Sequence, residues 1–324
     1  MKSIINGALA AISGLLLNNN LFAQEDITYW KNTGVRVDHR DSADYIRVIV
    51  PPGAGRELPH LVEYFPNEQV KKVGVILDGR NTRSFQGPVV EYYEDGQKRS
   101  EEFFDEGKRV GEGRYYYQNG RLKKLMRYGK GSSVPAMGPT DAAADTLVNY
   151  FDSLGNVLVT AGNGFVRETD DEDYEEGHYR NGLRDGEWTG SFMKGKYTFS
   201  ERYENGVVVS GVSRDTAGHS YPYENRGTPP EYPGGIRGLM QFVAGNYRYP
   251  PAALAAGVNG MLIFGFVVER DGSIAEIKVT QDLGYGTGAA GVQVLKRARK
   301  WKPGYQRGVP VRVSYMLPVR LNAP

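Results

Sequence analysis

The feature that most constrains the fold is a short motif that recurs through the first two thirds of the chain. A pair of aromatic residues is followed by one to three polar residues and a glycine. The clearest copies are residues 92–96 (YYEDG), 103–107 (FFDEG) and 115–120 (YYYQNG), with weaker copies at 150–155, 179–182 and 203–206. Each copy predicts a strand that ends in a tight turn, because Gly adopts positive φ freely and Asn or Asp do so at little cost. The segment is therefore expected to be a row of β-hairpins.

One hairpin of this kind is too small to bury its own aromatic face, so neighbouring hairpins must pair and share a core. We expect the Tyr and Phe side chains to form that core rather than a ligand surface, since strands favour aromatic residues. Residues 107–115 (GKRVGEGRY) and 179–188 (YRNGLRDGEW) resemble MORN repeats. The resemblance covers residues 62–212, with an interruption near 132–145. It implies an elongated meander that presents one face to a partner.

The amino-acid composition limits the fold classes and functions to be considered. The chain has 324 residues with 42 Gly and 22 Tyr, which favours many short strands and a β-rich protein. It has no Cys, so disulfides, thiol nucleophiles and Cys-bound metals are excluded. A formal net charge of +2 gives no reason to expect a nucleic-acid partner.

The N-terminal residues predict that the protein is exported from the cytoplasm. Lys2 precedes an apolar stretch over residues 4–17, and Ala23 provides the small residue that signal peptidase prefers before Gln24. The apolar stretch is shorter than the ~20 residues that a transmembrane helix needs. We therefore expect a cleaved signal peptide over residues 1–23 and a periplasmic protein. An uncleaved anchor, which would associate the chain with the inner membrane, and a buried helix are the alternatives.

Changes in composition divide the rest of the chain. Residues 24–61 form an N-terminal strand region, and residues 62–212 form the repeats. Residues 213–229 are rich in Pro, Gly and polar side chains, as a linker is. Residues 230–324 form a separate C-terminal domain.

The pattern changes in this last domain. Helical spacing is expected over residues 236–243 and 252–256, and again at Ala289, Val292, Leu295 and Ala298. Residues 261–268 are apolar on both faces, which predicts a central strand. Residues 274–280 follow a tight turn as a second strand, with Ala275, Ile277 and Val279 on one face. Residues 309–321 alternate and predict one last strand.

The order of these elements and several spaced motifs resemble the TonB C-terminal domain over residues 230–321, in the form common in Bacteroidetes. The motif residues are Tyr249, Pro250, Gly260, Asp271, Gly272, Trp301, Pro303 and Gly304. The resemblance implies an α+β domain, with a three-stranded antiparallel sheet and helices packed on one face. It also implies a periplasmic module that contacts outer-membrane transporters.

The last strand is the predicted binding site. Pro310 and Pro318 lack backbone donors, which suits an edge strand, and a free edge accepts an added peptide strand. The family binds an extended receptor segment in this way. The candidate partner-binding residues are Val311, Arg312, Val313, Ser314, Tyr315, Leu317 and Arg320. The alternative is that the two prolines only block aggregation.

Other motifs do not predict an enzyme, a cofactor or a metal site. Residues 284–288 (GYGTG) lack the Lys-Ser/Thr of a P-loop and are expected to be a loop that starts a helix. The acidic residues 168–176 lack the spacing of a calcium loop and are expected to form a solvated hairpin tip. The basic residues 296–302 are expected to be a solvated helix face, or a contact for acidic receptor segments.

The sequence therefore predicts a periplasmic TonB-like protein that binds a transporter segment by strand addition, in energy-coupled transport. The alternative is a repeat scaffold of the cell envelope without energy transduction. Energy-transducing members have a membrane anchor and a Pro-rich spacer, whereas here a cleavable signal and hairpins occupy those positions. An inner-membrane motor complex and a second copy of the chain are further candidate partners.

Overall fold

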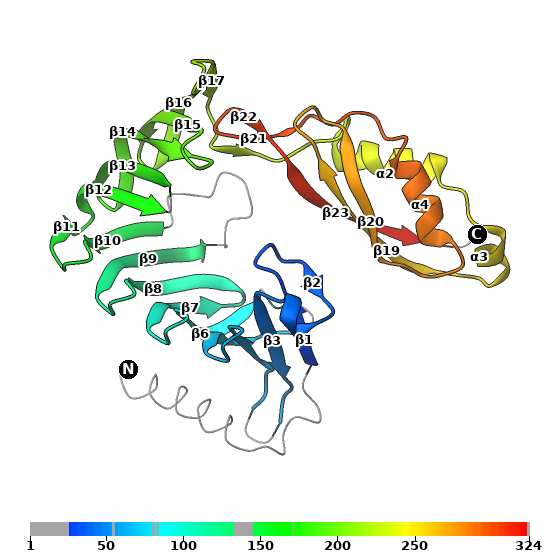
Figure 1. Cartoon of the computed structure of the whole chain (residues 1–324), viewed down its shortest axis with the longest axis horizontal. Helices are drawn as coiled ribbons and strands as arrows, with labels where there is room; N and C mark the ends of the chain where they lie inside the picture. The colour runs from blue at the N-terminus through cyan, green and yellow to red at the C-terminus, as the bar shows by residue number, and fades with distance from the viewer. Residues whose placement is uncertain are drawn as a thin grey trace.

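A computed structural model describes residues 26–53, 56–79, 82, 84–132, 145–170 and 172–322. The predicted signal peptide lies outside these residues. A long antiparallel meander forms the first part, and a small α+β domain follows it (Figure 1). The strands of the meander are β1 (Asp26–Trp30), β2 (Arg36–Val37), β3 (Tyr45–Val50), β4 (His60–Tyr64), β5 (Val70–Ile76), β6 (Phe85–Tyr92), β7 (Lys98–Asp105), β8 (Lys108–Tyr116), β9 (Leu122–Ser132), β10 (Asp145–Phe151), β11 (Val157–Thr160), β12 (Asn163–Asp170), β13 (Asp173–Arg180), β14 (Leu183–Phe192), β15 (Tyr197–Glu204), β16 (Val207–Asp215) and β17 (Ser220–Tyr223).

The predicted row of hairpins is confirmed. From β3 to β17 each strand pairs antiparallel with the next, and β1 lies between β2 and β3, which gives one 17-stranded sheet. The array follows an arc in Figure 1, from β1 at the blue end to β17 in green. The sheet includes strands before residue 62, and it continues to β17, which lies within the predicted linker of residues 213–229. The assignment of these hairpins as MORN repeats stays a prediction.

Charged side chains of alternating sign cross the first hairpins in one row. Arg47, Glu63, Lys72 and Glu91 lie directly opposite one another on β3, β4, β5 and β6. Arg47 forms an ion pair with Glu63 at 2.7 Å, and Lys72 forms one with Glu91 at 2.7 Å. Opposite charges in facing positions stabilise neighbouring strands and help to fix their register.

Further along the sheet, Tyr and Trp side chains are buried, as expected for a shared aromatic core. The Tyr115 hydroxyl donates to Glu102 at 2.6 Å, and Tyr128 reaches the same carboxylate at 3.2 Å. Trp188 is only 1% exposed, and its ring lies over Gly177, where a Cβ would come within 2.3 Å. Burial of these rings therefore depends on hydrogen bonds to carboxylates and on glycine at the point of contact.

The C-terminal domain has the predicted α+β architecture. Its elements are β18 (Gly227–Thr228), α2 (Gly235–Asn246), α3 (Pro251–Ala255), β19 (Gly260–Val268), β20 (Ile274–Gln281), α4 (Thr287–Leu295), β21 (Gly304–Gln306), β22 (Val309–Val311) and β23 (Val313–Leu321). β19 is central in an antiparallel sheet of order β20-β19-β23. Helices cover one face of this sheet, as expected.

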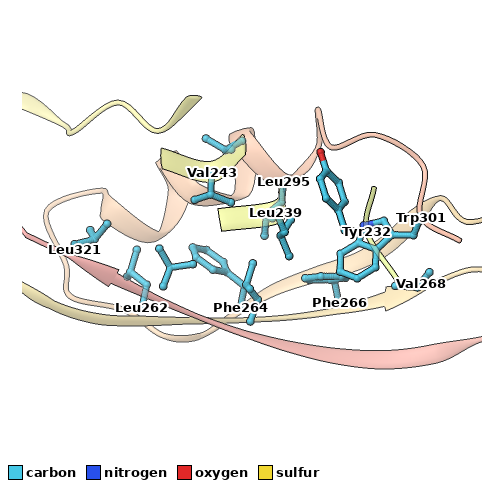
Figure 2. Close-up of a cluster of buried hydrophobic side chains, with 13 residues drawn as sticks. Tyr232, Leu239, Val243, Leu262, Phe264, Phe266, Val268, Leu295, Trp301 and Leu321 are labelled. Atoms are coloured by element: carbon cyan, nitrogen blue, oxygen red, sulfur yellow. The ribbon is translucent and has the colours of Figure 1, made fainter. Parts of the chain in front are cut away.

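The core of this domain lies between that face and the helices (Figure 2). Leu262, Phe264 and Phe266 point from β19 toward Leu239 of α2 and Leu295 of α4. All five are at most 3% exposed. The regular alternation along β19 thus places one complete set of its side chains in the core.

The expectation of one continuous strand over residues 309–321 was wrong. β22 pairs with β21 in a second small sheet, in which Tyr305 lies opposite Pro310. β23 begins only at Val313 and pairs with β19. The chain passes from one sheet to the other at Arg312. Val311 therefore belongs to the sheet of β21 and β22 and Val313 to the sheet of β19 and β23, although the alternation of side chains continues through both.

The β21–β22 hairpin joins the domain to the end of the meander. Arg307 and Gly308 form its turn, with φ angles of 48° and 77°. The Arg307 backbone carbonyl accepts a hydrogen bond from the Ser213 hydroxyl of β16 at 2.8 Å. A Cβ on Gly308 would lie 2.8 Å from the Tyr221 carbonyl oxygen of β17. This position therefore requires glycine both for its backbone angle and for its contact with β17.

Candidate partner-binding edge

The candidate site is the free edge of β23. This strand pairs with β19 from Val313 to Leu321 and has no strand on its other side among the described residues. It has nine residues and is the longest edge strand in the described part of the chain. The sequence prediction of an edge position is confirmed for residues 313–321.

The other sheet edges are less suited to strand addition. β2, β18 and β22 have two or three residues, and β17 has four residues and contains Pro222. β20 has eight residues, but its register with β19 shifts twice and Glu276 adopts a φ of 53°. Short strands, prolines and bulges are the features with which proteins protect sheet edges. β23 has a single proline and regular pairing along its length.

Side chains of β23 alternate between the core and solvent. Leu317, Val319 and Leu321 are at most 7% exposed and belong to the core. Ser314, Met316, Pro318 and Arg320 are exposed, on the face that the helices leave open. Met316 is 55% exposed.

The backbone of the same alternate residues faces the free edge. Pro318 lies opposite Ile263, and a proline fits an edge strand when its nitrogen faces away from the neighbouring strand. Because the backbone direction repeats every second residue, the N–H groups of Ser314, Met316 and Arg320 point to the free side as well. The edge thus offers three donors and the carbonyl groups of the same residues to an added strand.

The structure brings five of the seven predicted residues together on β23, namely Val313, Ser314, Tyr315, Leu317 and Arg320. It does not place the other two there. Val311 is buried in β22. Arg312 lies between the strands, with ion pairs to Glu269 at 2.8 Å and to Glu276 at 2.7 Å. These carboxylates raise the pKa of Arg312 and hold its guanidinium against the β19–β20 hairpin.

Met316 and Pro318 belong to this edge and were not among the predicted contact residues. Both occupy exposed alternate positions between Ser314 and Arg320. The two-residue period that selects Ser314 and Arg320 would also have selected them. The free edge is therefore defined here as Ser314, Met316, Pro318 and Arg320.

The family-motif residues lie away from this edge and stabilise the domain. Gly272 has a φ of 81°, and a Cβ there would come within 1.9 Å of the Trp301 carbonyl oxygen. The Trp301 N–H donates to the Gly272 carbonyl at 2.8 Å. The buried Trp301 ring contacts Tyr232, Phe266 and Tyr315 at centroid distances of 5.5, 5.6 and 4.9 Å.

The remaining motif residues form turns and strand ends. Asp271 accepts hydrogen bonds from the Ser273 backbone and hydroxyl, and Lys300 forms an ion pair with it at 2.7 Å. Pro250 precedes α3, and the Tyr249 ring packs against the core. Gly260 begins β19, and Gly304 follows Pro303 to begin β21. These positions explain the spacing of the motif by packing and turn geometry.

The glycine-rich loop at 284–288 and the acidic segment at 168–176 have structural roles in the described residues. Asp282 accepts hydrogen bonds from Thr287 and from the Gly288 N–H at the start of α4, so a carboxylate already occupies that helix end. Residues 168–170 and 173–176 lie on the paired strands β12 and β13, but Glu175 forms ion pairs with Arg226 and Arg307 at the junction between the two parts. The described residues contain no group of His, Cys, Asp and Glu that could hold a metal ion.

These features define a small α+β domain with a free edge strand, held against the end of a β-hairpin array. Residues 245–322 match the family model of the Gram-negative bacterial TonB protein C-terminal, as the motifs predicted. This family is a non-enzymatic domain associated with transport. The match begins within α2, so the resemblance over residues 230–244 stays a prediction. No curated protein matches the chain.

TonB proteins are periplasmic or associated with the cell envelope. Within the ranges that the structure describes, no helix is long and apolar enough to span a membrane.

Proposed function

We propose that this chain is a periplasmic TonB-like protein that binds an extended segment of an outer-membrane transporter by strand addition to β23, in energy-coupled transport. The observation that carries the proposal is the free edge of β23 within a domain that matches the TonB family. An added strand gains backbone hydrogen bonds along the edge and takes its specificity from alternate side chains.

The edge also favours a certain partner sequence. Arg320 is the only charged residue on β23 and is exposed, whereas Met316 and Pro318 are apolar. We therefore expect the transporter segment to carry an acidic side chain opposite Arg320 and apolar side chains toward the middle of β23. In this proposal the protein is exported by a cleaved signal peptide and is not an enzyme.

The absence of cysteine makes a direct test possible. Single cysteines at Ser314, Met316 or Arg320 should form disulfides with a cysteine-scanned transporter segment, and the productive partner position should move by two residues for each two-residue step along β23. A cysteine at Lys278, on the opposite edge strand, is the matched control. Equal cross-linking from Lys278 and Met316 would contradict strand addition at β23.

One observation favours the alternative hypothesis, a repeat scaffold of the cell envelope. The junction at Arg307 fixes the C-terminal domain to the meander through buried ion pairs, so the hairpin array is suited to hold the free edge at a set position. The scaffold function is favoured if partners still bind when the β23 edge is blocked but no longer bind when the meander is removed. Contact with an inner-membrane motor and pairing of two copies are separate predictions that strand addition does not require.

A further inference from the structure

A cavity of about 250 Å³ lies on the first hairpins, far in sequence from β23. Strands β3 to β7 supply its walls, together with Asn32 from the β1–β2 connection. Its charged side chains are Arg47, Glu63, Lys71, Lys72, Glu91 and Arg99. The cavity is too small for a drug-sized ligand, since such sites usually measure about 300–1,000 Å³.

The charges around this cavity do not balance. Four side chains are cationic and two are carboxylates. Both carboxylates are already paired, Glu63 with Arg47 and Glu91 with Lys72, each at 2.7 Å. Among the residues that the structure describes, Lys71 and Arg99 form no ion pair with a carboxylate. The half-buried Lys71 and the exposed Arg99 are therefore two positive charges of this cavity that no carboxylate compensates.

Lys71 is held in position despite this imbalance. Its ammonium donates to the Asn32 side-chain oxygen at 3.0 Å and lies 4.0 Å from the centre of the Tyr45 ring. Burial lowers the pKa of Lys71, and the attraction of Glu63 and Glu91 does not overcome that effect. An additional negative charge next to Lys71 would stabilise its ammonium form.

We propose that this cavity binds a small oxyanion between Lys71 and Arg99. Arg presents a planar fork of donors that fits carboxylate and phosphate oxygens, and Lys adds a point charge. The surplus of two cations matches a dianion such as a dicarboxylate or a phosphate. The site is independent of strand addition at β23, so either proposal can fail without the other.

The test uses the full exported chain with ¹³C-labelled lysine at low ionic strength. The Lys71 side-chain resonance, identified through Lys71→Gln, is followed by NMR during titration with succinate, with inorganic phosphate and with chloride at equal ionic strength. We expect a saturable shift with succinate or phosphate, and whichever anion saturates identifies the ligand class. Arg99→Gln should weaken that binding at least tenfold while leaving the melting temperature unchanged, because Arg99 is exposed.

Lys108→Gln is the matched control, because Lys108 is an exposed cation outside the cavity. This variant should bind as tightly as the wild type. A response to succinate and phosphate that never saturates and equals that of chloride would overturn the proposal. Saturable binding that is insensitive to Arg99→Gln would overturn it as well.

Discussion

The Arg307 Nε atom lies 2.9 Å from the Glu201 carboxylate although 106 residues separate the two in sequence. Arg307 also donates to Glu175 at 2.7 Å, and its guanidinium lies 3.6 Å from the centre of the Phe199 ring. Its side chain is 5% exposed, and that of Glu201 is 0% exposed. The hairpin of the C-terminal domain thus completes a buried ion cluster at the end of the meander.

Replacement of Arg307 should lower the stability of the protein, because this residue links the C-terminal domain to the meander. Arg307→Met leaves Glu201 and Glu175 with less compensating charge in a buried place, and breaking a buried pair on one side costs about 3–5 kcal/mol. We expect a loss of this size in the free energy of unfolding, measured by urea denaturation. Arg307→Met combined with Glu201→Gln should recover part of the loss, because it removes one of the uncompensated carboxylates.

Arg312→Met is the control for this experiment. Arg312 also pairs with two glutamates in the same domain, but its side chain is 50% exposed. Exposed ion pairs contribute little to stability, so the free energy of unfolding of this variant should be close to that of the wild type. Equal effects of Arg307→Met and Arg312→Met would contradict the importance of the buried cluster.

The same cluster predicts a dependence of stability on pH. Burial opposes ionisation of Glu175, but the charges of Arg184, Arg226 and Arg307 outweigh it and lower the pKa of Glu175 from 4.5 to about 2. At about 1.4 kcal/mol per pKa unit, this carboxylate contributes about 3 kcal/mol of stability. Because its pKa is lower in the folded state, the contribution is complete above pH 4.5 and is lost as the pH falls toward 2.

Urea denaturation of Glu175→Gln over that pH range checks this expectation. The variant should be less stable than the wild type at pH 7, and the difference should shrink as the pH falls from about 5 to 2. Glu176→Gln, which removes a neighbouring carboxylate paired with the exposed Arg167, should follow the wild-type profile. A difference between Glu175→Gln and wild type that stays constant down to pH 2 would rule out the assigned pKa.

Gly272 should be far more sensitive to substitution than a glycine with the same backbone angle. Gly272→Ala places a Cβ 1.9 Å from the Trp301 carbonyl oxygen, whereas Gly284, with a φ of 78°, has nothing within 4 Å. Both variants carry the cost of positive φ, about 1–2 kcal/mol. The overlap should add about 1–3 kcal/mol for Gly272→Ala, measured from thermal unfolding. Equal losses in the two variants would show that the contact with Trp301 is unimportant.

The hairpins and the central position of β19 could be predicted because both depend on local sequence. Each Tyr or Phe pair followed by a turn glycine specifies its own hairpin, and the unbroken apolar run of 261–268 is typical of a central strand, although helices cover only one face of β19. The face assigned to Ala275 was wrong. Ala275 lies opposite Val267, away from the core, because the chain bulges at Glu276, where φ is 53°.

The break at Arg312 and the role of Arg307 could not be predicted, because both depend on contacts between distant segments. Alternation runs without a gap from Val309 to Leu321, so only pairing of β22 with β21 reveals the change of sheet. Arg307 followed by Gly308 is typical of a solvated hairpin turn. Its burial arises from side chains of β13, β14 and β15, which no local pattern connects to it. The edge position of the last strand could therefore be predicted over residues 313–321, whereas the point at which this strand begins could not.

Binding of transporter segments to two variants of Met316 tests the central claim most directly. Met316→Pro removes a backbone donor from the free edge without breaking the β19 ladder, whereas Met316→Ala keeps that donor and shortens the side chain. Affinity is measured on the full exported chain, with extended peptides copied from periplasmic segments of outer-membrane transporters, and thermal unfolding confirms that both variants fold. Strand addition predicts at least a tenfold loss of affinity for Met316→Pro and a much smaller loss for Met316→Ala. Wild-type affinity in a folded Met316→Pro variant would contradict it.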